Sequence, residues 1–234
     1  MILALLAALA SAGECVAVTA ADVLDVKAPG ILVLGERHGT QPDLRRAARV
    51  VRTYAERMRT TVALEAVPSS AQPTLDGYAA GAVPVAELPM RLDWEEAWGF
   101  PWGPYAPLVT ASRWGARVVG AGLPLGGPPE GREVPVPPRY IDLLRDAMGG
   151  HDIPLGQESR FVQAMAWRDL AIAEAALAGW DGKGWLIVVT GRGHVEGGKG
   201  VAWQLDRLSE APVHSFVLAW GQDPACYPGD RLWR

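Results

Sequence analysis

The chain of 234 residues is long enough to bury a hydrophobic core without help from disulfides or metal ions. Hydrophobic residues make up 49% of it and charged residues 21%, which is typical of a soluble globular protein. The net charge is −4 and no basic block is present, so the composition gives no support to a nucleic-acid-binding function. Ten tryptophans accompany only three phenylalanines. This excess indicates either a flat ligand-binding surface or a core packed with tryptophan.

Residues 1–12 form a short apolar run that ends in Ala10-Ser11-Ala12, as the cleavage site of a signal peptide does, although no Lys or Arg precedes it. The run is too short to span a bilayer, so we expect no transmembrane anchor there. Glu14 stands where a lipid-attachment signal needs a small residue. We therefore predict that residues 1–12 are a signal peptide, that the protein is periplasmic or secreted without lipidation, and that residues 13–234 form one domain.

The only two cysteines, Cys15 and Cys226, lie near opposite ends of the sequence. The ends of a domain often lie close together, and cysteines of exported proteins commonly pair, so a disulfide is one interpretation. The other interpretation is two free thiols in a cytoplasmic protein, and the sequence leaves both open.

From Ile31 onward, short β-branched runs alternate with longer helical patterns, which indicates an α/β fold with a mostly parallel central sheet flanked by helices. Most of the runs are continuously apolar, as expected for strands that are covered on both faces. The predicted strands are Ile31–Leu34, Thr61–Leu64, Arg117–Val119, Trp185–Thr190 and Val213–Leu218.

The helix after the first of these strands has the clearest pattern. Thr40 is placed to cap it, with Asp43 completing a capping box. Its arginines are interpreted as a solvated face, and they are Arg45, Arg46, Arg49, Arg52 and, beyond them, Arg59.

Prolines then break residues 68–108 into short helical pieces, which predicts a helical excursion over one edge of the sheet. A loop over residues 124–138 and helices at about 139–148, 157–178 and 201–208 complete the chain.

Two of the predicted strands end in the same four-residue pattern, Gly35-Glu36-Arg37-His38 and Gly191-Arg192-Gly193-His194. Glycine at a strand end permits a sharp turn and close backbone approach. Each histidine is then presented at the carboxyl edge of the sheet, where open α/β sheets bind their ligands. A third strand ends in Glu65. A carboxylate at the end of an apolar strand is costly unless it meets a partner or a metal.

Together Glu36, His38, Glu65 and His194 are expected to converge within about 4–8 Å of each other. Two carboxylates and two imidazoles suit a divalent metal ion with an open position, or general acid–base catalysis with Glu36 and Glu65 as the catalytic carboxylates. A single histidine at a strand end is more often only a hydrogen-bonding partner in the turn. The repetition in two matching turns favours a functional site. The other histidines, His151 and His214, are interpreted as structural.

Other catalytic patterns are missing from the sequence. It contains no Gly-x-Ser-x-Gly, no His-Glu-x-x-His and no Cys-x-x-Cys motif. The segment Gly193–Lys199 is similar to a phosphate-binding loop, but Gly200 takes the place of the Ser or Thr that would hold Mg²⁺. Nucleotide binding is therefore not predicted.

These residues, with further segments in the same order, resemble the ChaN-like haem-binding uptake proteins of the Tiki/TraB superfamily over about residues 30–221. The matching segments are Leu34–His38, Leu64-Glu65, Asp93–Trp98 with Tyr105, Val118–Gly120, Gln163, Arg168-Asp169 and Gly191–Val195 with Gly200-Val201. Ile172 departs from a methionine of the family, and this change keeps an apolar side chain.

The resemblance implies a parallel α/β fold with a smaller helical part, export, and haem as the cofactor. A tyrosine can ligate the iron in haem-binding relatives, and here Tyr105, near Trp98, is the preferred match and Tyr140 its competitor. Other members of the superfamily are metal-dependent hydrolases, whose site maps to His38, His194 and Glu65 with Glu36 adjacent. Two functions therefore stay open, namely an exported haem-binding protein of iron uptake and a metal-dependent protease or esterase acting on a peptide or small molecule. A homodimer also remains open.

Overall fold

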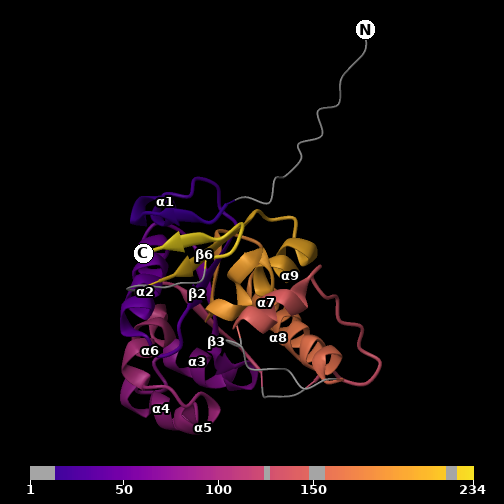
Figure 1. Cartoon of the computed structure of the whole chain (residues 1–234). Helices are drawn as coiled ribbons and strands as arrows, with labels where there is room; N and C mark the ends of the chain where they lie inside the picture. Colours follow the sequence, from indigo (N-terminus) through magenta and orange to yellow (C-terminus); the bar gives the residue numbers. More distant parts are fainter. Residues whose placement is uncertain (1–13, 124–126, 148–155, 220–225) are drawn as a thin grey trace.

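The structure, a computed structural model, describes residues 14–123, 127–147, 156–219 and 226–234. These residues form a seven-stranded sheet in the order β1-β7-β6-β2-β5-β3-β4, in which every pair of neighbouring strands is parallel (Figure 1). The strands are β1 (Val16–Val18), β2 (Ile31–Glu36), β3 (Thr60–Pro68), β4 (Arg117–Gly122), β5 (Trp185–Gly191), β6 (Val213–Leu218) and β7 (Arg231–Trp233).

The predicted α/β fold with a parallel central sheet is confirmed. Each of the five predicted strands is present, and β2, β3, β4 and β5 run further toward the carboxyl edge than predicted. The short strands β1 and β7 were not predicted. They pair with each other at one side of the sheet, and β7 also pairs with β6.

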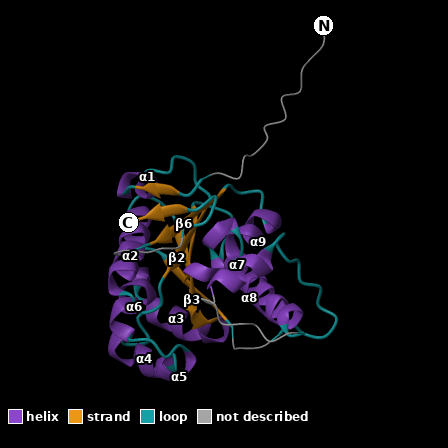
Figure 2. Cartoon of the chain, in the orientation of Figure 1, coloured by secondary structure: helices purple, strands orange, loops and turns teal. Residues whose placement is uncertain are grey.

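Helices cover both faces of the sheet (Figure 2). One face carries α2 (Gln41–Ala55) and the helical excursion, which consists of α3 (Gln72–Ala79), α4 (Leu88–Arg91), α5 (Trp94–Ala97) and α6 (Trp102–Val109). The other face carries α8 (Glu158–Gly179) and α9 (Val201–Leu208), with α7 (Tyr140–Ala147) packed against α8. The remaining helix α1 (Ala20–Leu24) packs near α2. Short 3₁₀ turns lie at Ser69–Ala71, Val85–Glu87, Ala111–Trp114, Arg192–His194 and Glu196–Gly198.

Alternation along the strands divides the core into two layers. In β2, Leu32 and Leu34 pack toward α2 and the excursion, whereas Ile31 and Val33 pack toward α8 and α9. All four side chains are fully buried, and burying each contributes about 1.5–3 kcal/mol to folding. The continuous apolar runs of the central strands therefore serve both faces of the sheet.

The connections after the neighbouring parallel strands β2 and β5 cross the sheet in opposite directions. The connection from β2 to β3 runs through α2 on one face, and the connection from β5 to β6 runs through α9 on the other. The carboxyl ends of two such neighbouring strands form a crevice, because their connections depart in opposite directions. The segments Gly35–His38 and Gly191–His194, which we call the two glycine-histidine turns, lie in this crevice.

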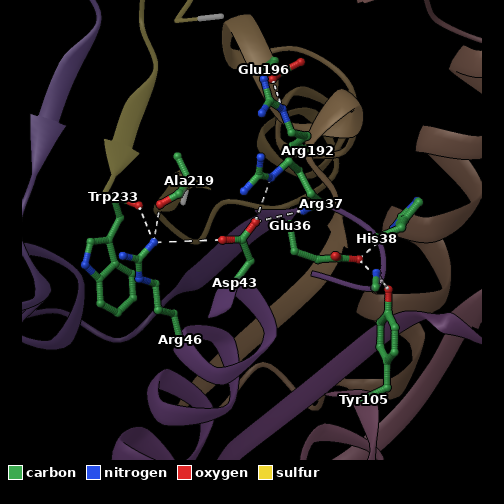
Figure 3. Close-up of polar contacts among 11 residues, drawn as sticks. Glu36, Arg37, His38, Asp43, Arg46, Tyr105, Arg192, Glu196, Ala219 and Trp233 are labelled. Carbon is green, nitrogen blue, oxygen red and sulfur yellow. Dashed lines mark hydrogen bonds and ion pairs between the residues drawn. The ribbon is translucent and has the colours of Figure 1, made fainter. Parts of the chain in front are cut away.

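The start of α2 differs from the prediction. Thr40 precedes the helix as expected, but its side chain makes no capping hydrogen bond. Asp43 is fully buried and accepts hydrogen bonds from the backbone and side-chain nitrogens of Arg37, at 3.3 and 3.4 Å, so the predicted capping box is wrong. Arg46 is not a solvated residue either, since its guanidinium donates to the main-chain oxygens of Ala219 and Trp233 (Figure 3).

Cys15 and Cys226 form a disulfide, with their Cα atoms 5.7 Å apart. Of the two interpretations of these cysteines, the structure therefore shows pairing. The apolar run 1–12, His151 and the start of the predicted 124–138 loop lie outside the described residues. Within the described ranges, no helix combines the length and the hydropathy that crossing a membrane requires.

The disulfide closes a loop with a sequence separation of 211 residues, and we predict that it contributes about 5 kcal/mol to the free energy of unfolding by restricting the unfolded chain. Cys226→Ser should lower the unfolding free energy measured in urea by that amount. Reduction of the wild-type protein should have the same effect, and the variant should not respond to reductant. Equal urea midpoints for the oxidised wild type and the variant would contradict this.

Candidate functional site

The two glycine-histidine turns fit into each other. A Cβ atom placed on Gly191 would lie 2.7 Å from Cε1 of His38, and one placed on Gly35 would lie 2.9 Å from Cα of Arg192. Both distances are shorter than real Cβ contacts allow. The glycine of each turn is therefore required so that a residue of the other turn can approach.

The first turn brings Glu36, His38 and Tyr105 together (Figure 3). Nδ1 of His38 lies 2.7 Å from Oε1 of Glu36, and because a carboxylate only accepts, the imidazole donates this hydrogen bond. The hydroxyl of Tyr105, on α6, donates to the same oxygen at 3.1 Å and accepts from the backbone nitrogen of Gly39 at 3.0 Å. Tyr105 thus holds both the carboxylate and the turn.

Burial shifts the pKa values of all three groups, and for His38 the neighbouring Glu36 reverses the direction of the shift. Glu36 is 2% exposed, its second oxygen Oε2 has no hydrogen-bond partner, and burial raises the pKa of this carboxyl group although His38 opposes the shift. For His38 burial alone would lower the pKa, but the hydrogen bond and the charge of Glu36 raise it overall. Burial and the neighbouring Glu36 raise the pKa of the Tyr105 hydroxyl, so it stays protonated.

Glu65, on β3, is surrounded by donors. Its Oε2 accepts from the Thr190 hydroxyl and from the backbone nitrogen of Gly191, both at 2.7 Å. Its Oε1 lies 3.1 Å from the guanidinium of Arg168 and 3.4 Å from Nε2 of His194. This buried carboxylate therefore has protein donors as partners, which is one of the two possibilities that the sequence left open.

His194 lies between two carboxylates. Its Nδ1 is 2.6 Å from Oδ1 of Asp169, whose other oxygen accepts from the Tyr140 hydroxyl. Asp169 is fully buried in the middle of α8. In the sequence, Arg168-Asp169 belongs to the segments that carry the family resemblance, but nothing there gives either residue a role in the site. The signal that the sequence offered was two adjacent charged residues in an otherwise largely apolar stretch of this helix.

These contacts fix the charges of the inner cluster. For Glu65 burial would raise the pKa, but the charge and hydrogen bond of His194, the charge of His38 and the Thr190 hydroxyl hold it well below its usual range. For His194 burial would lower the pKa, but Glu65 and Asp169 outweigh burial and raise the pKa from 6.5 to about 10. Because both ring nitrogens face carboxylates, the protonated form of His194 is favoured.

The four predicted residues thus form two pairs that meet at Gly191. Glu36 and His38 are one pair, and Glu65 and His194 are the other. Gly191 touches both, since its Cβ position would lie 2.8 Å from Nε2 of His38 and 3.6 Å from Oε2 of Glu65. In the described part of the chain, no group of three or more histidine, cysteine, aspartate or glutamate side chains could hold a metal ion. The structure does not support the divalent-metal alternative.

The excursion adds an aromatic wall to this site. The ring of His38 packs against Trp98 and Phe100, with centroids 4.7 and 5.2 Å apart. Trp98 lines a pocket of about 570 Å³ together with Glu65, Arg168 and Leu123. The excursion borders the cleft through Trp98. Trp94 is largely buried and lines, with Trp102, a different hollow of about 620 Å³, so only part of the tryptophan excess faces the cleft.

We predict that His194 makes the protein less stable as the pH rises from about 6.5 to 10. Its pKa is raised on folding, so its contribution is complete below the unfolded-state pKa of 6.5 and is lost as the pH approaches the folded value of about 10. Urea unfolding across this range should show a falling unfolding free energy, and NMR should show a charged His194 at neutral pH. Asp169→Asn should lower the His194 pKa. A neutral His194 in the wild type at pH 7.5 would contradict the assignment.

Several solved structures are similar to this chain. ChaN of Campylobacter jejuni, a structure described as showing cofacial haem binding, aligns with a TM-score of 0.66 and 16% identity over 86% of each chain. RRSP, a MARTX toxin effector domain from Vibrio vulnificus, aligns with a TM-score of 0.50 and 20% identity over 84% of this chain and 34% of that one. The type III effector HopBA1 aligns with a TM-score of 0.46 and 16% identity over 81% and 76%. At these identities the likeness concerns the fold alone.

The sequence itself identifies the family. No curated protein matches the chain. The model of the family described as haem-binding uptake, Tiki superfamily, ChaN matches residues 23–205, which is most of the chain and contains both glycine-histidine turns. This chain therefore belongs to the ChaN haem-binding uptake family of the Tiki superfamily.

Proposed function

We propose that this protein binds haem in the pocket between Trp98 and Arg168, as an exported component of haem or iron uptake. The observation that carries the proposal is the pocket itself. It combines a flat apolar wall, which Trp98 and Leu123 contribute, with the guanidinium of Arg168. Its volume of about 570 Å³ lies within the range of small-molecule and cofactor sites.

The residues of this pocket fit the chemistry of haem. A porphyrin is a flat apolar ring that needs aromatic or aliphatic walls, and its propionates need a cation. Arg168 is an ion-pair partner of Glu65, and its side chain is 18% exposed. A guanidinium has five donors in a planar fork, so one carboxylate does not exhaust it. Arg168 can therefore hold Glu65 and a propionate together.

For the iron we propose His38 as the ligand rather than either tyrosine. The hydroxyls of Tyr105 and Tyr140 are both buried and both donate to carboxylates. The His38 side chain is 31% exposed and packs against the Trp98 ring, beside the residues that line the pocket rather than among them. Its Nδ1 is held by Glu36, which leaves Nε2 as the ligating nitrogen, and histidines that bind metals commonly have the other nitrogen held in this way. Tyr105 then serves to position Glu36.

Two observations support export. Disulfides persist in oxidising compartments such as the periplasm or the extracellular space, and Cys15 is paired with Cys226. The apolar run 1–12 that ends in Ala10-Ser11-Ala12 has the length of a signal-peptide core. Both agree with a protein that meets haem outside the cytoplasm.

A second function, hydrolysis by general acid–base catalysis, is favoured by one specific observation. Glu36 is a buried carboxyl group with a raised pKa and an oxygen without a hydrogen-bond partner, beside the partly exposed His38. A carboxyl group whose pKa is shifted toward neutrality is suited to proton transfer. A protein that only carries haem does not need such a pair.

Haemin titration followed by the Soret band tests the haem site. We expect Trp98→Ala to weaken binding about tenfold or more, because an aromatic wall of this size is worth about 1.5–3 kcal/mol. The matched control is Trp203→Ala, which removes a tryptophan on α9 away from the pocket and should leave the affinity unchanged. An unaltered affinity in Trp98→Ala would contradict the proposed location.

The iron ligand is tested separately by the absorption spectrum of the haemin complex. His38→Gln should change the spectrum, whereas Tyr105→Phe should leave its bands in place. If Tyr105→Phe instead removes a tyrosinate-to-iron charge-transfer band, Tyr105 is the ligand and the assignment to His38 is wrong, while haem binding itself stands.

For hydrolysis we expect the purified protein to cleave fluorescein-labelled casein or p-nitrophenyl acetate, with Glu36→Gln reducing the rate about a hundredfold or more, as loss of a general acid or base does. Glu95→Gln, on the exposed side of α5, is the matched control. No cleavage of either probe, or equal rates in the wild type and Glu36→Gln, would count against this second function.

A further inference from the structure

The turn that carries His194 is braced by the last strand connection of the chain. After His194 the chain continues into the 3₁₀ turn Glu196–Gly198, in which Gly197 has a φ of 66°. The backbone nitrogen of Gly197 donates to Oδ1 of Asp230 at 2.8 Å. Asp230 is 3% exposed, so this hydrogen bond is made in a site from which water is largely excluded.

Asp230 also binds the segment on its own side. Its Oδ2 accepts from the backbone nitrogen of Tyr227 at 2.9 Å, and its main-chain oxygen accepts from Val16 at 2.8 Å. Both carboxylate oxygens and the carbonyl of one buried residue therefore connect three segments, namely the turn after His194, the turn Tyr227–Asp230 and the start of β1.

The disulfide fixes two of these three segments. Cys15 directly precedes Val16, the first residue of β1, and Cys226 directly precedes Tyr227. The strand β1 is only three residues long, lies at the edge of the sheet and pairs with β7 alone. With so few hydrogen bonds of its own, this corner depends on the covalent link for its position.

The turn itself leaves little room for movement of its parts. A Cβ atom on Gly200 would lie 2.3 Å from the main-chain oxygen of His194, so the chain folds back tightly on the histidine. The imidazole must at the same time keep its contacts with Asp169 and Glu65. Loss of the brace at Gly197 therefore acts directly on the segment that positions His194.

We propose that the Cys15–Cys226 disulfide is a redox latch, which holds the Tyr227–Asp230 turn against Gly197 and thereby keeps the His194 turn ordered. A dithiol reductant transfers two electrons and two protons to the disulfide, which yields the two thiols while the dithiol becomes a cyclic disulfide. The freed segment then opens locally, and the His194 turn opens with it. In this way the inner cluster is complete only after oxidation, outside the reducing cytoplasm. The proposal does not depend on which ligand the pocket takes.

Amide hydrogen exchange measured by NMR tests the latch on the full chain. The reporters are the amides of Val195, Gly197 and Lys199, which are hydrogen-bonded in or beside the turn, and the controls are Val62 and Ile187 in the central strands. We expect a dithiol to lower the protection factors of the three reporters to at least about tenfold below those of the two controls, because the reporters then exchange through a local opening, whereas the controls follow the loss of global stability predicted for the reduced protein.

Two variants make the outcome decisive. Cys15→Ser with Cys226→Ser should show fast reporters that do not respond to the dithiol. Asp230→Asn keeps the disulfide but has one acceptor oxygen for two backbone donors, so its reporters should exchange fast even when oxidised. The proposal is overturned if reduction leaves the reporters slow, if reporters and controls have equal protection factors after reduction because all of them exchange by global unfolding, or if oxidised Asp230→Asn behaves like the wild type.

Discussion

The carboxylate of Glu65 is the group on which the arrangement of the site depends. A buried carboxylate is tolerated only when donors replace the water that it has lost, and here they come from β5, from α8 and from the His194 turn. A single side chain in the second half of β3 thus specifies where a neighbouring strand ends, how α8 lies across the sheet and which way an imidazole points. Burial of the apolar strands supplies the free energy of folding, and the hydrogen bonds of this carboxylate determine how the carboxyl ends of the strands are arranged.

The site combines an inner part of fixed charge with an outer part that can exchange protons. In the inner part, Glu65 and Asp169 balance Arg168 and His194, and all four are buried or nearly so. In the outer part, His38 is partly open and shares one oxygen of Glu36 with Tyr105. Trp98 of the aromatic excursion packs against His38 in the outer part and also lines the pocket that Glu65 and Arg168 of the inner part reach. A ligand in that pocket would therefore meet Trp98 and Arg168 together, while Glu65, Asp169 and His194 hold the strand ends in place.

The sequence predicts the centre of this fold better than its margins. The five strands it indicates have long apolar runs that are buried on both faces, and such runs leave a clear pattern. The strands β1 and β7 have three residues each and exist because they pair with each other beside the disulfide, so no local periodicity reveals them. At the level of the site, two strand-end motifs and Glu65 located the cleft, because the ends of parallel strands share one edge.

What the sequence did not reveal depends on contacts between distant segments. Asp43 follows Thr40 at the spacing of a capping box, but the preceding turn offers it Arg37, and a charged donor in a buried place outweighs a local cap. Arg46 belongs to a row of surface arginines by spacing, yet it alone reaches main-chain oxygens at the end of β6 and β7. Asp169 looks like an ordinary helical residue until the His194 turn is placed beside it.

The mutual fit of Gly35 and Gly191 has a consequence for how this site can change. Since Glu36 is in register with Gly191 across β2 and β5, a side chain at Gly191 would have to displace His38, and a side chain at Gly35 would have to displace Arg192. Neither turn can be remodelled while the other stays as it is. The two turns can therefore diverge in evolution only through paired substitutions. Grafting the site onto another parallel sheet would likewise require both turns together with their register.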